Sequence, residues 1–154
     1  MLRKIIGLFV AALALAGVNS VALAAGGTPD EAKAMVEKAI KLIEAEGKDK
    51  AIATINSTGG GGFIDRDLYV VFVDMTGTTR AHAANQALVG KVMLNVKDAD
   101  GKEFVKEMVT GAQSAGSGWV DYKWPNPVTK QIEQKSSYVQ KIGDVLVGVG
   151  VYKG

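Results

Sequence analysis

The run Leu68-Tyr69-Val70-Val71-Phe72-Val73-Asp74 is the clearest indication of the fold class of this chain. It is rich in β-branched and aromatic residues, which favour an extended strand. Met75-Thr76-Gly77 follows as a turn, and the residues from Thr78 to Ala84 can return beside the first strand. We therefore predict a β-hairpin over residues 68–84.

The segment before this hairpin has helical periodicity instead. Thr28-Pro29-Asp30-Glu31 supplies an N-cap hydroxyl, a proline at the first helical position and a carboxylate that can close a capping box. Apolar residues then recur at helical spacing as far as Gly47, opposite a charged face, which predicts an amphipathic helix of about four turns. We expect a shorter helix around residues 50–56 and a flexible glycine joint over Thr58 to Gly62.

The chain after the hairpin returns to strands after one helical interruption. A turn at Asp98-Ala99-Asp100-Gly101 precedes a helical stretch from Glu103 to Gln113. Three further strands are expected, over Trp119 to Trp124, Lys135 to Ile142 and Val145 to Lys153. A long N-terminal helix followed by a five-stranded antiparallel sheet is an α+β arrangement.

The last predicted strand has an unusual face. Its four valines share one side, whereas Gly148 and Gly150 leave the opposite side without side chains. We expect a bulky group to approach the sheet there.

The first two dozen residues have the pattern of an export signal. Arg3 and Lys4 form a basic start, the apolar run from Ile5 to Gly17 is too short to cross a bilayer comfortably, and Ala22-Leu23-Ala24 has the spacing of a cleavage site. We predict a signal peptide over residues 1–24, cleaved near Ala24; a retained membrane anchor is the alternative. We expect a soluble periplasmic or secreted protein, because no later segment is long and apolar enough to span a membrane.

The composition indicates one domain and excludes several kinds of chemistry. The chain has 154 residues, 47% of them hydrophobic and 22% charged, with a net charge of +2 that vanishes when Arg3 and Lys4 are removed. We divide the mature chain into N-terminal helices with the glycine joint, residues 25–62, and a core, residues 63–154. A neutral chain without a basic stripe gives no footprint for nucleic acid.

Motifs for metals, cofactors and catalysis are incomplete. The absence of cysteine and the single His82 exclude thiolate sites and leave little for imidazole ligands. An EF-hand alignment on Gly101 puts Val96 where the first carboxylate should stand, which favours a simple turn over a calcium site. Ser114 stands one residue too far along for a hydrolase elbow. We therefore expect no metal, no cofactor and no enzymatic activity.

Aromatic residues are only 6% of the chain, yet several fall in one short stretch. Trp119, Tyr122 and Trp124 lie within six residues and are followed by Pro125-Asn126-Pro127. In an extended segment Tyr122 and Trp124 point to one face and Trp119 to the other. Such a wall of rings and polar tips suits a small polar organic ligand, and ordinary core packing explains it equally well.

Taken together, several runs of this sequence resemble the single Cache sensor domain: Asp67 to Asp74, Ala81 to Asn85, Leu88 to Lys91, Asp98 to Phe104, Gly118 to Pro127, Lys135 to Val139 and Gly148 to Tyr152. The resemblance covers about residues 63–153. It implies a PAS-like antiparallel sheet with a long N-terminal helix. It also implies an extracytoplasmic pocket for small metabolites such as carboxylates.

The resemblance further implies a set of ligand-binding residues: Phe72, His82, Asn85, Trp119, Tyr122, Lys135 and Tyr138. Lys135 can neutralise a carboxylate, His82 and Asn85 can donate hydrogen bonds to it, and the rings can exclude water. The alternatives are a solvated surface charge for Lys135 and a structural imidazole for His82. Ala83 and Gln86 depart from the family pattern, which has Gly after the histidine and Pro after the asparagine.

The leading hypothesis is an exported, non-enzymatic Cache protein that binds a small organic ligand of the carboxylate type for extracytoplasmic sensing. The chain ends at Lys153-Gly154 without a second membrane span or an output module, so we expect a membrane receptor or kinase as partner and a monomer or homodimer. A structural or interaction module without a ligand is the second hypothesis. A hydrolase that uses His82 and Asp121 is the third.

Overall fold

The computed structural model describes residues 25–154, so the predicted signal peptide over residues 1–24 lies outside the described residues. Its elements are α1 (Pro29–Glu46), α2 (Lys48–Ile55), the 3-10 turn η1 (Thr58–Gly62), β1 (Ile64–Asp65), β2 (Leu68–Asp74), β3 (Thr79–His82), the 3-10 turn η2 (Gln86–Leu88), α3 (Phe104–Ala115), β4 (Ser117–Pro125), β5 (Ile132–Ile142) and β6 (Val145–Tyr152). None of the helices in this described range is long and apolar enough to cross a membrane.

The strands form one antiparallel sheet in the order β1-β2-β6-β5-β4, and β3 pairs with β2. The predicted hairpin corresponds to β2 and β3, and the three later strands are β4, β5 and β6. The α+β prediction with its PAS-like sheet is therefore confirmed. The sixth strand of the described chain is β1, a two-residue addition at the start of β2.

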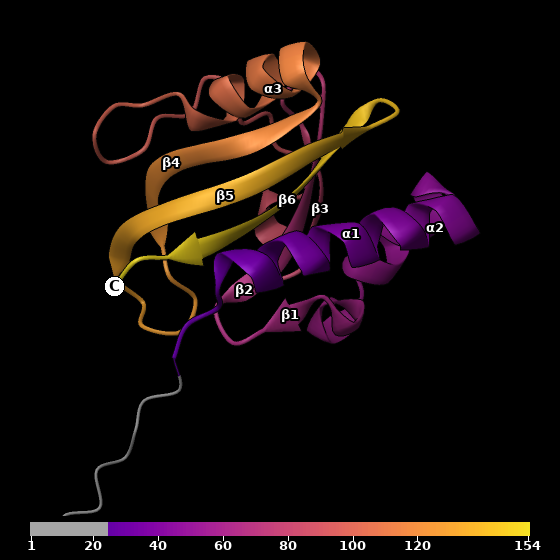
Figure 1. The fold of residues 1–154 in the computed structure, drawn as a ribbon, viewed down its shortest axis with the longest axis horizontal. Helices are drawn as coiled ribbons and strands as arrows, with labels where there is room; N and C mark the ends of the chain where they lie inside the picture. The colour runs from indigo at the N-terminus through magenta and orange to yellow at the C-terminus, as the bar shows by residue number, and fades with distance from the viewer. Residues whose placement is uncertain (1–24) are drawn as a thin grey trace, which may run out of the picture.

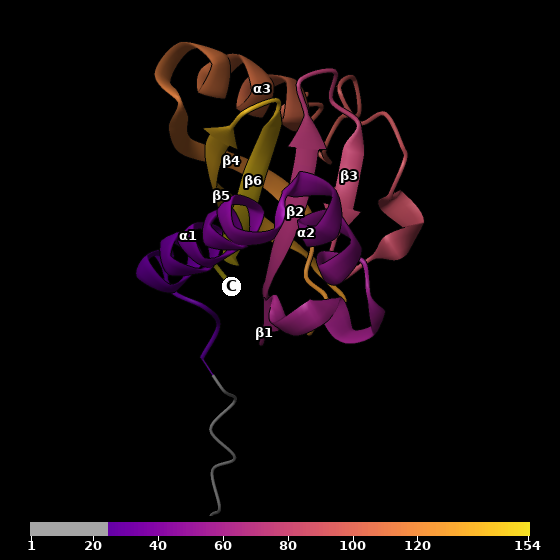
Figure 2. The same cartoon turned by 90° about the vertical axis from the view of Figure 1, so that its right-hand side faces the viewer.

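Helices cover both faces of this sheet (Figures 1 and 2). α1 and α2 bury small and branched side chains against one face, where Phe72 and the valines of β6 lie. α3 covers part of the other face, with Phe104, Val105 and Met108 directed into a second apolar cluster. Each central strand therefore has buried side chains on both sides.

The start of α1 has the capping box that the sequence predicts. The Glu31 N–H donates to the Thr28 hydroxyl at 3.3 Å, and the Thr28 N–H donates to the Glu31 carboxylate at 2.8 Å. Because these contacts satisfy N–H groups that the first helical turn leaves unpaired, they fix where α1 begins. Gly47, with φ of 87°, ends it.

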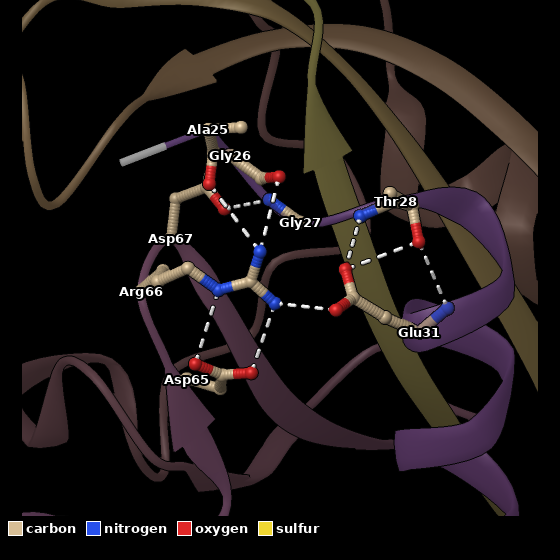
Figure 3. A network of polar contacts seen from close by, with 8 residues as sticks. All are labelled: Ala25, Gly26, Gly27, Thr28, Glu31, Asp65, Arg66 and Asp67. Carbon is tan, nitrogen blue, oxygen red and sulfur yellow. Dashed lines mark hydrogen bonds and ion pairs between the residues drawn. The ribbon is translucent and has the colours of Figure 1, made fainter. Parts of the chain in front are cut away.

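A polar network ties the N-terminal segment to the turn between β1 and β2 (Figure 3). Asp67, which is buried, accepts a hydrogen bond of 2.7 Å from the Gly27 N–H. The guanidinium of Arg66 donates to two carboxylates and two backbone carbonyls, those of Glu31, Asp65, Ala25 and Gly26. The entry to α1 is thus docked onto the sheet.

The glycine-rich stretch that the sequence suggests as a flexible joint forms the turn η1. Gly59, Gly60 and Gly61 all have left-handed φ values, between 59° and 76°. Gly60 is buried, and a Cβ at position 61 would overlap the carbonyl of Thr54. Glycine is needed in this turn for its conformation and for close packing against α2.

Candidate functional site

A cavity of about 60 Å³ lies between the sheet and α3. Apolar side chains form most of its wall, among them Val71 and Val73 of β2 and Phe104, Val105 and Met108 of α3. Six polar side chains also line it: Tyr69, Thr79, His82, Tyr122, Lys135 and Ser137. The arrangement is that of a small-molecule site, mostly apolar with a few polar groups.

The glycine face of β6 forms part of the floor of this cavity. Gly150 lies beneath Lys135, and a Cβ there would overlap the lysine Cε atom and the Ser137 hydroxyl. A Cβ at Gly148 would lie 3.2 Å from the Val139 side chain. The prediction that a bulky group approaches this face is confirmed: the group is the side chain of Lys135 at Gly150, and Val139 lies against Gly148.

Lys135 is a buried amine, with only 2% of its surface exposed. Its Nζ donates a hydrogen bond of 2.7 Å to the Tyr69 hydroxyl and lies 4.7 Å from the centroid of the Tyr152 ring. No carboxylate within residues 25–154 lies within ion-pair distance of Nζ. Burial lowers the pKa of Lys135 to about 7, and the charge of Asp67 opposes that shift. The amine can therefore take a proton when an anion arrives.

His82 is buried beside Lys135 and has a fixed tautomer. Its Nδ1 accepts a hydrogen bond of 2.9 Å from the Asn85 N–H. Burial, followed by the charge of Lys135, lowers the pKa of His82 to about 4, so the ring is neutral at pH 7. A neutral imidazole whose Nδ1 accepts must carry its proton on Nε2. That Nε2–H is a hydrogen-bond donor on a side chain that lines the cavity.

Tyr122 and Ser137 add a pair of hydroxyl groups. Their oxygens lie 3.0 Å apart, and the Tyr122 ring stacks on Phe104 with centroids 4.3 Å apart. Burial raises the pKa of the Tyr122 phenol, so it stays protonated. Because one hydroxyl donates to the other, a single hydroxyl hydrogen remains that could reach a ligand.

A second, more open hollow of about 330 Å³ adjoins the cavity. The two share Tyr69, His82, Leu88 and Trp124 as lining residues. The turn between β4 and β5 borders the hollow with Asn126, Pro127 and Lys130. This turn therefore adds an exposed cation, Lys130, to the lining of the hollow.

Comparison with known families assigns this architecture. The family described as Single Cache domain 2 matches residues 18–154. The chain belongs to this Cache family. The curated relatives of this Cache chain include the methyl-accepting chemotaxis protein McpP of Pseudomonas putida, 33% identical over 57% of this chain and 16% of the relative. The sensor histidine kinase MctS of Rhizobium johnstonii is 34% identical over 56% of this chain and 19% of the relative. The chain therefore spans less than a fifth of the length of these two proteins.

Solved Cache structures agree with the fold. One solved structure, described as the structural basis for carboxylic acid recognition by a Cache chemosensory domain, is 27% identical to this chain. The match covers 81% of this chain and 88% of that one, with a TM-score of 0.63. A periplasmic sensor domain of a chemotaxis protein is 25% identical, with coverages of 81% and 90% and a TM-score of 0.63. A methyl-accepting chemotaxis protein from Vibrio parahaemolyticus is 21% identical, with coverages of 80% and 86% and a TM-score of 0.69.

The Cache structure brings part of the predicted site together. His82, Tyr122 and Lys135 line the cavity. Asn85 lies at the adjoining hollow, where its N–H holds His82 and its side-chain oxygen accepts from the Ala87 N–H. These four residues come from β3, β4, β5 and the segment after β3.

The other three predicted residues lie on the opposite face of the Cache sheet. Phe72 is fully buried in the cluster beneath α1 and α2. Trp119 and Tyr138 are cross-strand neighbours with ring centroids 5.4 Å apart, and the Lys33 ammonium of α1 lies over both rings. Alternation along each strand is the reason, because the cavity face takes the neighbouring positions.

The polar residues that sequence reasoning missed are two tyrosines, a serine and Thr79 of β3, which also lines the cavity. Tyr69 lies on the cavity face two residues before Val71, and Ser137 stands two residues after Lys135. Tyr152 pairs with Lys135 across β5 and β6. The period of two along each strand would have identified Ser137 once Lys135 was placed in the pocket.

The Asp98 turn is used for structure. The Asp98 carboxylate accepts hydrogen bonds of 2.8 to 3.0 Å from three backbone N–H groups, those of Asp100, Lys102 and Lys123. These contacts close the loop before α3 and hold it against the edge of β4. This arrangement agrees with the interpretation of the motif as a turn.

Proposed function

We propose that this Cache domain binds a small monocarboxylate at Lys135. The observation that carries the proposal is the buried lysine amine, which lines an apolar cavity and has no carboxylate partner among residues 25–154. Burying a cation without a counter-charge is costly, and a carboxylate ligand supplies both the counter-charge and hydrogen-bond acceptors. His82 Nε2–H and the free hydroxyl hydrogen of the Tyr122 and Ser137 pair are further donors for it.

The size and lining of the cavity favour a short acid with one charge. A cavity of about 150 Å³ suffices for benzene, whereas this one has a volume of about 60 Å³. Its remaining wall is apolar, which suits an alkyl group. Lys135 is the single lysine or arginine that lines it within the described chain, so a second ligand carboxylate would be buried without a counter-charge. We therefore infer acids of about two to four carbons.

The relatives support a role in sensing. One solved relative is described by its carboxylic acid recognition, and the curated relatives are a chemotaxis receptor and a sensor kinase. We propose that residues 1–24 direct this chain to the periplasm or outside the cell and are removed near Ala24. The bound form would then act through a membrane receptor or kinase partner.

We propose that the domain is not an enzyme. Asp121, the sequence-based partner for His82, forms an ion pair with Lys153 at 3.3 Å and lies on the opposite side of β4 from Tyr122. The Nδ1 of His82 is occupied by a backbone N–H. The acid and the imidazole that a hydrolase would need are therefore held apart.

A module without a ligand is the competing proposal, and one observation favours it. The Lys135 ammonium already lies over the rings of Tyr69, Tyr152 and Tyr122, at 4.0, 4.7 and 5.9 Å from their centroids. Such contacts stabilise a cation without any added anion. In this case the Lys135 side chain fills space beside the cavity and binds no ligand.

A thermal-shift and calorimetric screen distinguishes carboxylate binding from a module without a ligand. Acetate, propionate and butyrate are compared with succinate, amino acids and amines. An acid present at 100 times its dissociation constant should stabilise the fold by about 2.7 kcal/mol. The short monocarboxylates should give this shift and Lys135→Met should abolish it. If none of the acids shifts the wild-type protein or gives binding heat, the carboxylate proposal is overturned and the ligand-free module is favoured.

A further inference from the structure

A chain of hydrogen bonds leads away from the cavity through two buried hydroxyl groups. Lys135 Nζ donates to the Tyr69 hydroxyl at 2.7 Å, and the Tyr69 and Tyr152 hydroxyl oxygens lie 3.0 Å apart. The Tyr152 hydroxyl lies 2.7 Å from the carbonyl oxygen of Pro125. The chain thus joins β5, β2 and β6 to the end of β4.

The direction of every hydrogen bond in this chain is determined. The Pro125 carbonyl can only accept, so the Tyr152 hydroxyl must donate to it. Tyr152 has no second hydroxyl hydrogen, so it accepts from Tyr69. Tyr69 in turn accepts from Lys135. A hydroxyl that donates becomes a better acceptor, so each link strengthens the one before it.

We propose that Tyr152 is a positioning residue for the ligand cavity: acting through Tyr69, its hydroxyl orients the Lys135 amine and strengthens the hydrogen bond that the amine donates. Tyr152 is 8% exposed, and its side chain is not among those that line the cavity. The inference rests on the proposed function for its meaning, because Lys135 is the group that would hold the carboxylate.

The charged form of Lys135 gains most from this arrangement, because hydrogen bonds donated by a cation are stronger than neutral ones. Loss of the Tyr152 hydroxyl should therefore make Lys135 release its proton more readily. The other titratable groups that act on this cluster stay in place: Tyr69 from β2, Tyr122 from β4, His82 from β3, Glu133 from β5 and Asp67 before β2.

The test uses Tyr152→Phe, which keeps the ring and its contact with the lysine. Protein labelled with ¹³C-lysine gives the titration midpoint of Lys135 by NMR without any ligand, and Lys135→Met assigns the signal. We expect the midpoint to fall by about half a pH unit in Tyr152→Phe and by about one to two units in Tyr69→Phe. Tyr138→Phe is the matched control, because Tyr138 lies on the opposite face of β5, and it should leave the midpoint unchanged.

The double variant separates positioning from a merely structural role. Because Tyr152 acts through Tyr69, adding Tyr152→Phe to Tyr69→Phe should lower the midpoint no further. A wild-type midpoint in Tyr152→Phe, an additive double variant or an equal shift in Tyr138→Phe would overturn the inference. The hydroxyl resonances of Tyr69 and Tyr152 in the wild-type protein test the chain of hydrogen bonds without any variant, and both should exchange slowly with water. Rapid exchange of both would also overturn the inference.

Propionate titrations then test whether this chain of hydrogen bonds affects ligand binding. At pH 8, half a unit less in the midpoint means about threefold less charged lysine, so propionate should bind Tyr152→Phe about threefold more weakly than Tyr138→Phe. Equal propionate affinities would show that the hydroxyl does not act on the ligand site. If the wild-type protein binds no acid at all, the proposed function fails, whereas the ligand-free titration still decides the role of Tyr152.

Discussion

The side chain of Lys135 crosses Gly150 so closely that a Cβ atom at position 150 would overlap the lysine Cε atom. The two residues lie on neighbouring strands, β5 and β6, and the glycine leaves the space through which the lysine reaches Tyr69. The position of the only buried amine in the described part of the chain therefore depends on a missing side chain.

Gly150→Ala should displace this lysine. The added methyl group forces Lys135 and Ser137 to move, which should cost about 1–3 kcal/mol of stability and weaken propionate binding about tenfold. Gly118→Ala in β4 is the matched control, because a Cβ there meets nothing within 4 Å. Calorimetry and urea unfolding measure both effects. Wild-type propionate affinity in Gly150→Ala would contradict this account of the cavity floor.

Lys135→Met should abolish carboxylate binding and at the same time stabilise the ligand-free protein. Methionine fills similar space without the cost of burying an amine, which should raise the free energy of unfolding at pH 7 by about 1–3 kcal/mol. The Tyr69 hydroxyl keeps Tyr152 as its acceptor, so no new unpaired donor is created. A destabilised Lys135→Met would contradict the prediction.

The pH dependence of stability should identify the same lysine. The pKa of Lys135 is about 7 in the folded state and near 10.5 in the unfolded state, so between these values the unfolded chain holds a proton that the folded chain lacks. The free energy of unfolding should therefore rise with pH from 7 to about 9.5, by up to about 1.4 kcal/mol per unit. Urea unfolding should show this rise in the wild type and in Lys41→Met, a surface control, and not in Lys135→Met.

The sequence could predict the strands but not which face of the sheet carries the cavity. Alternation tells inside from outside only when one face meets water, and β2 is apolar on both faces because helices cover both. Phe72 and Val71 are therefore equally good pocket candidates by residue type. The same ambiguity explains why Trp119 and Tyr138 were predicted to bind the ligand. Their rings lie beneath Lys33, on the face of the sheet that α1 covers.

No short stretch of the sequence indicates the polar contacts that define the site. Lys135 and Tyr69 are 66 positions apart, and Tyr69 and Tyr152 are 83 positions apart. Their proximity depends on the strand order, in which β6 lies between β2 and β5. The capping box of α1, by contrast, lies within four consecutive residues and could be predicted completely.

His82 should make the protein less stable as the pH falls below neutrality. Its pKa is about 4 in the folded state and near 6.5 when unfolded, so between these values the unfolded chain binds a proton that the folded chain does not. The free energy of unfolding should drop by up to about 1.4 kcal/mol per unit over this range. The fall between pH 6.5 and 5 should be smaller in His82→Gln. Because this is the only histidine, its NMR titration is unambiguous, and a midpoint near 6.5 would refute the buried neutral ring.

Gly27→Ala should undock the entry to α1 without changing the cavity. A Cβ at position 27 would overlap the side chain of Leu68, which is 1% exposed, so the segment must move away from Asp67. We expect a loss of about 1–3 kcal/mol in unfolding free energy and faster hydrogen exchange at the start of α1, with propionate affinity unchanged. Arg66→Gln, which removes exposed ion pairs from the network of Figure 3, should lower stability much less than Gly27→Ala does, because solvent screens these pairs. The control Gly111→Ala, in the open surface of α3, should instead stabilise by about 0.5–1 kcal/mol. Wild-type stability in Gly27→Ala would show that the close approach of Gly27 to Leu68 is not needed for docking.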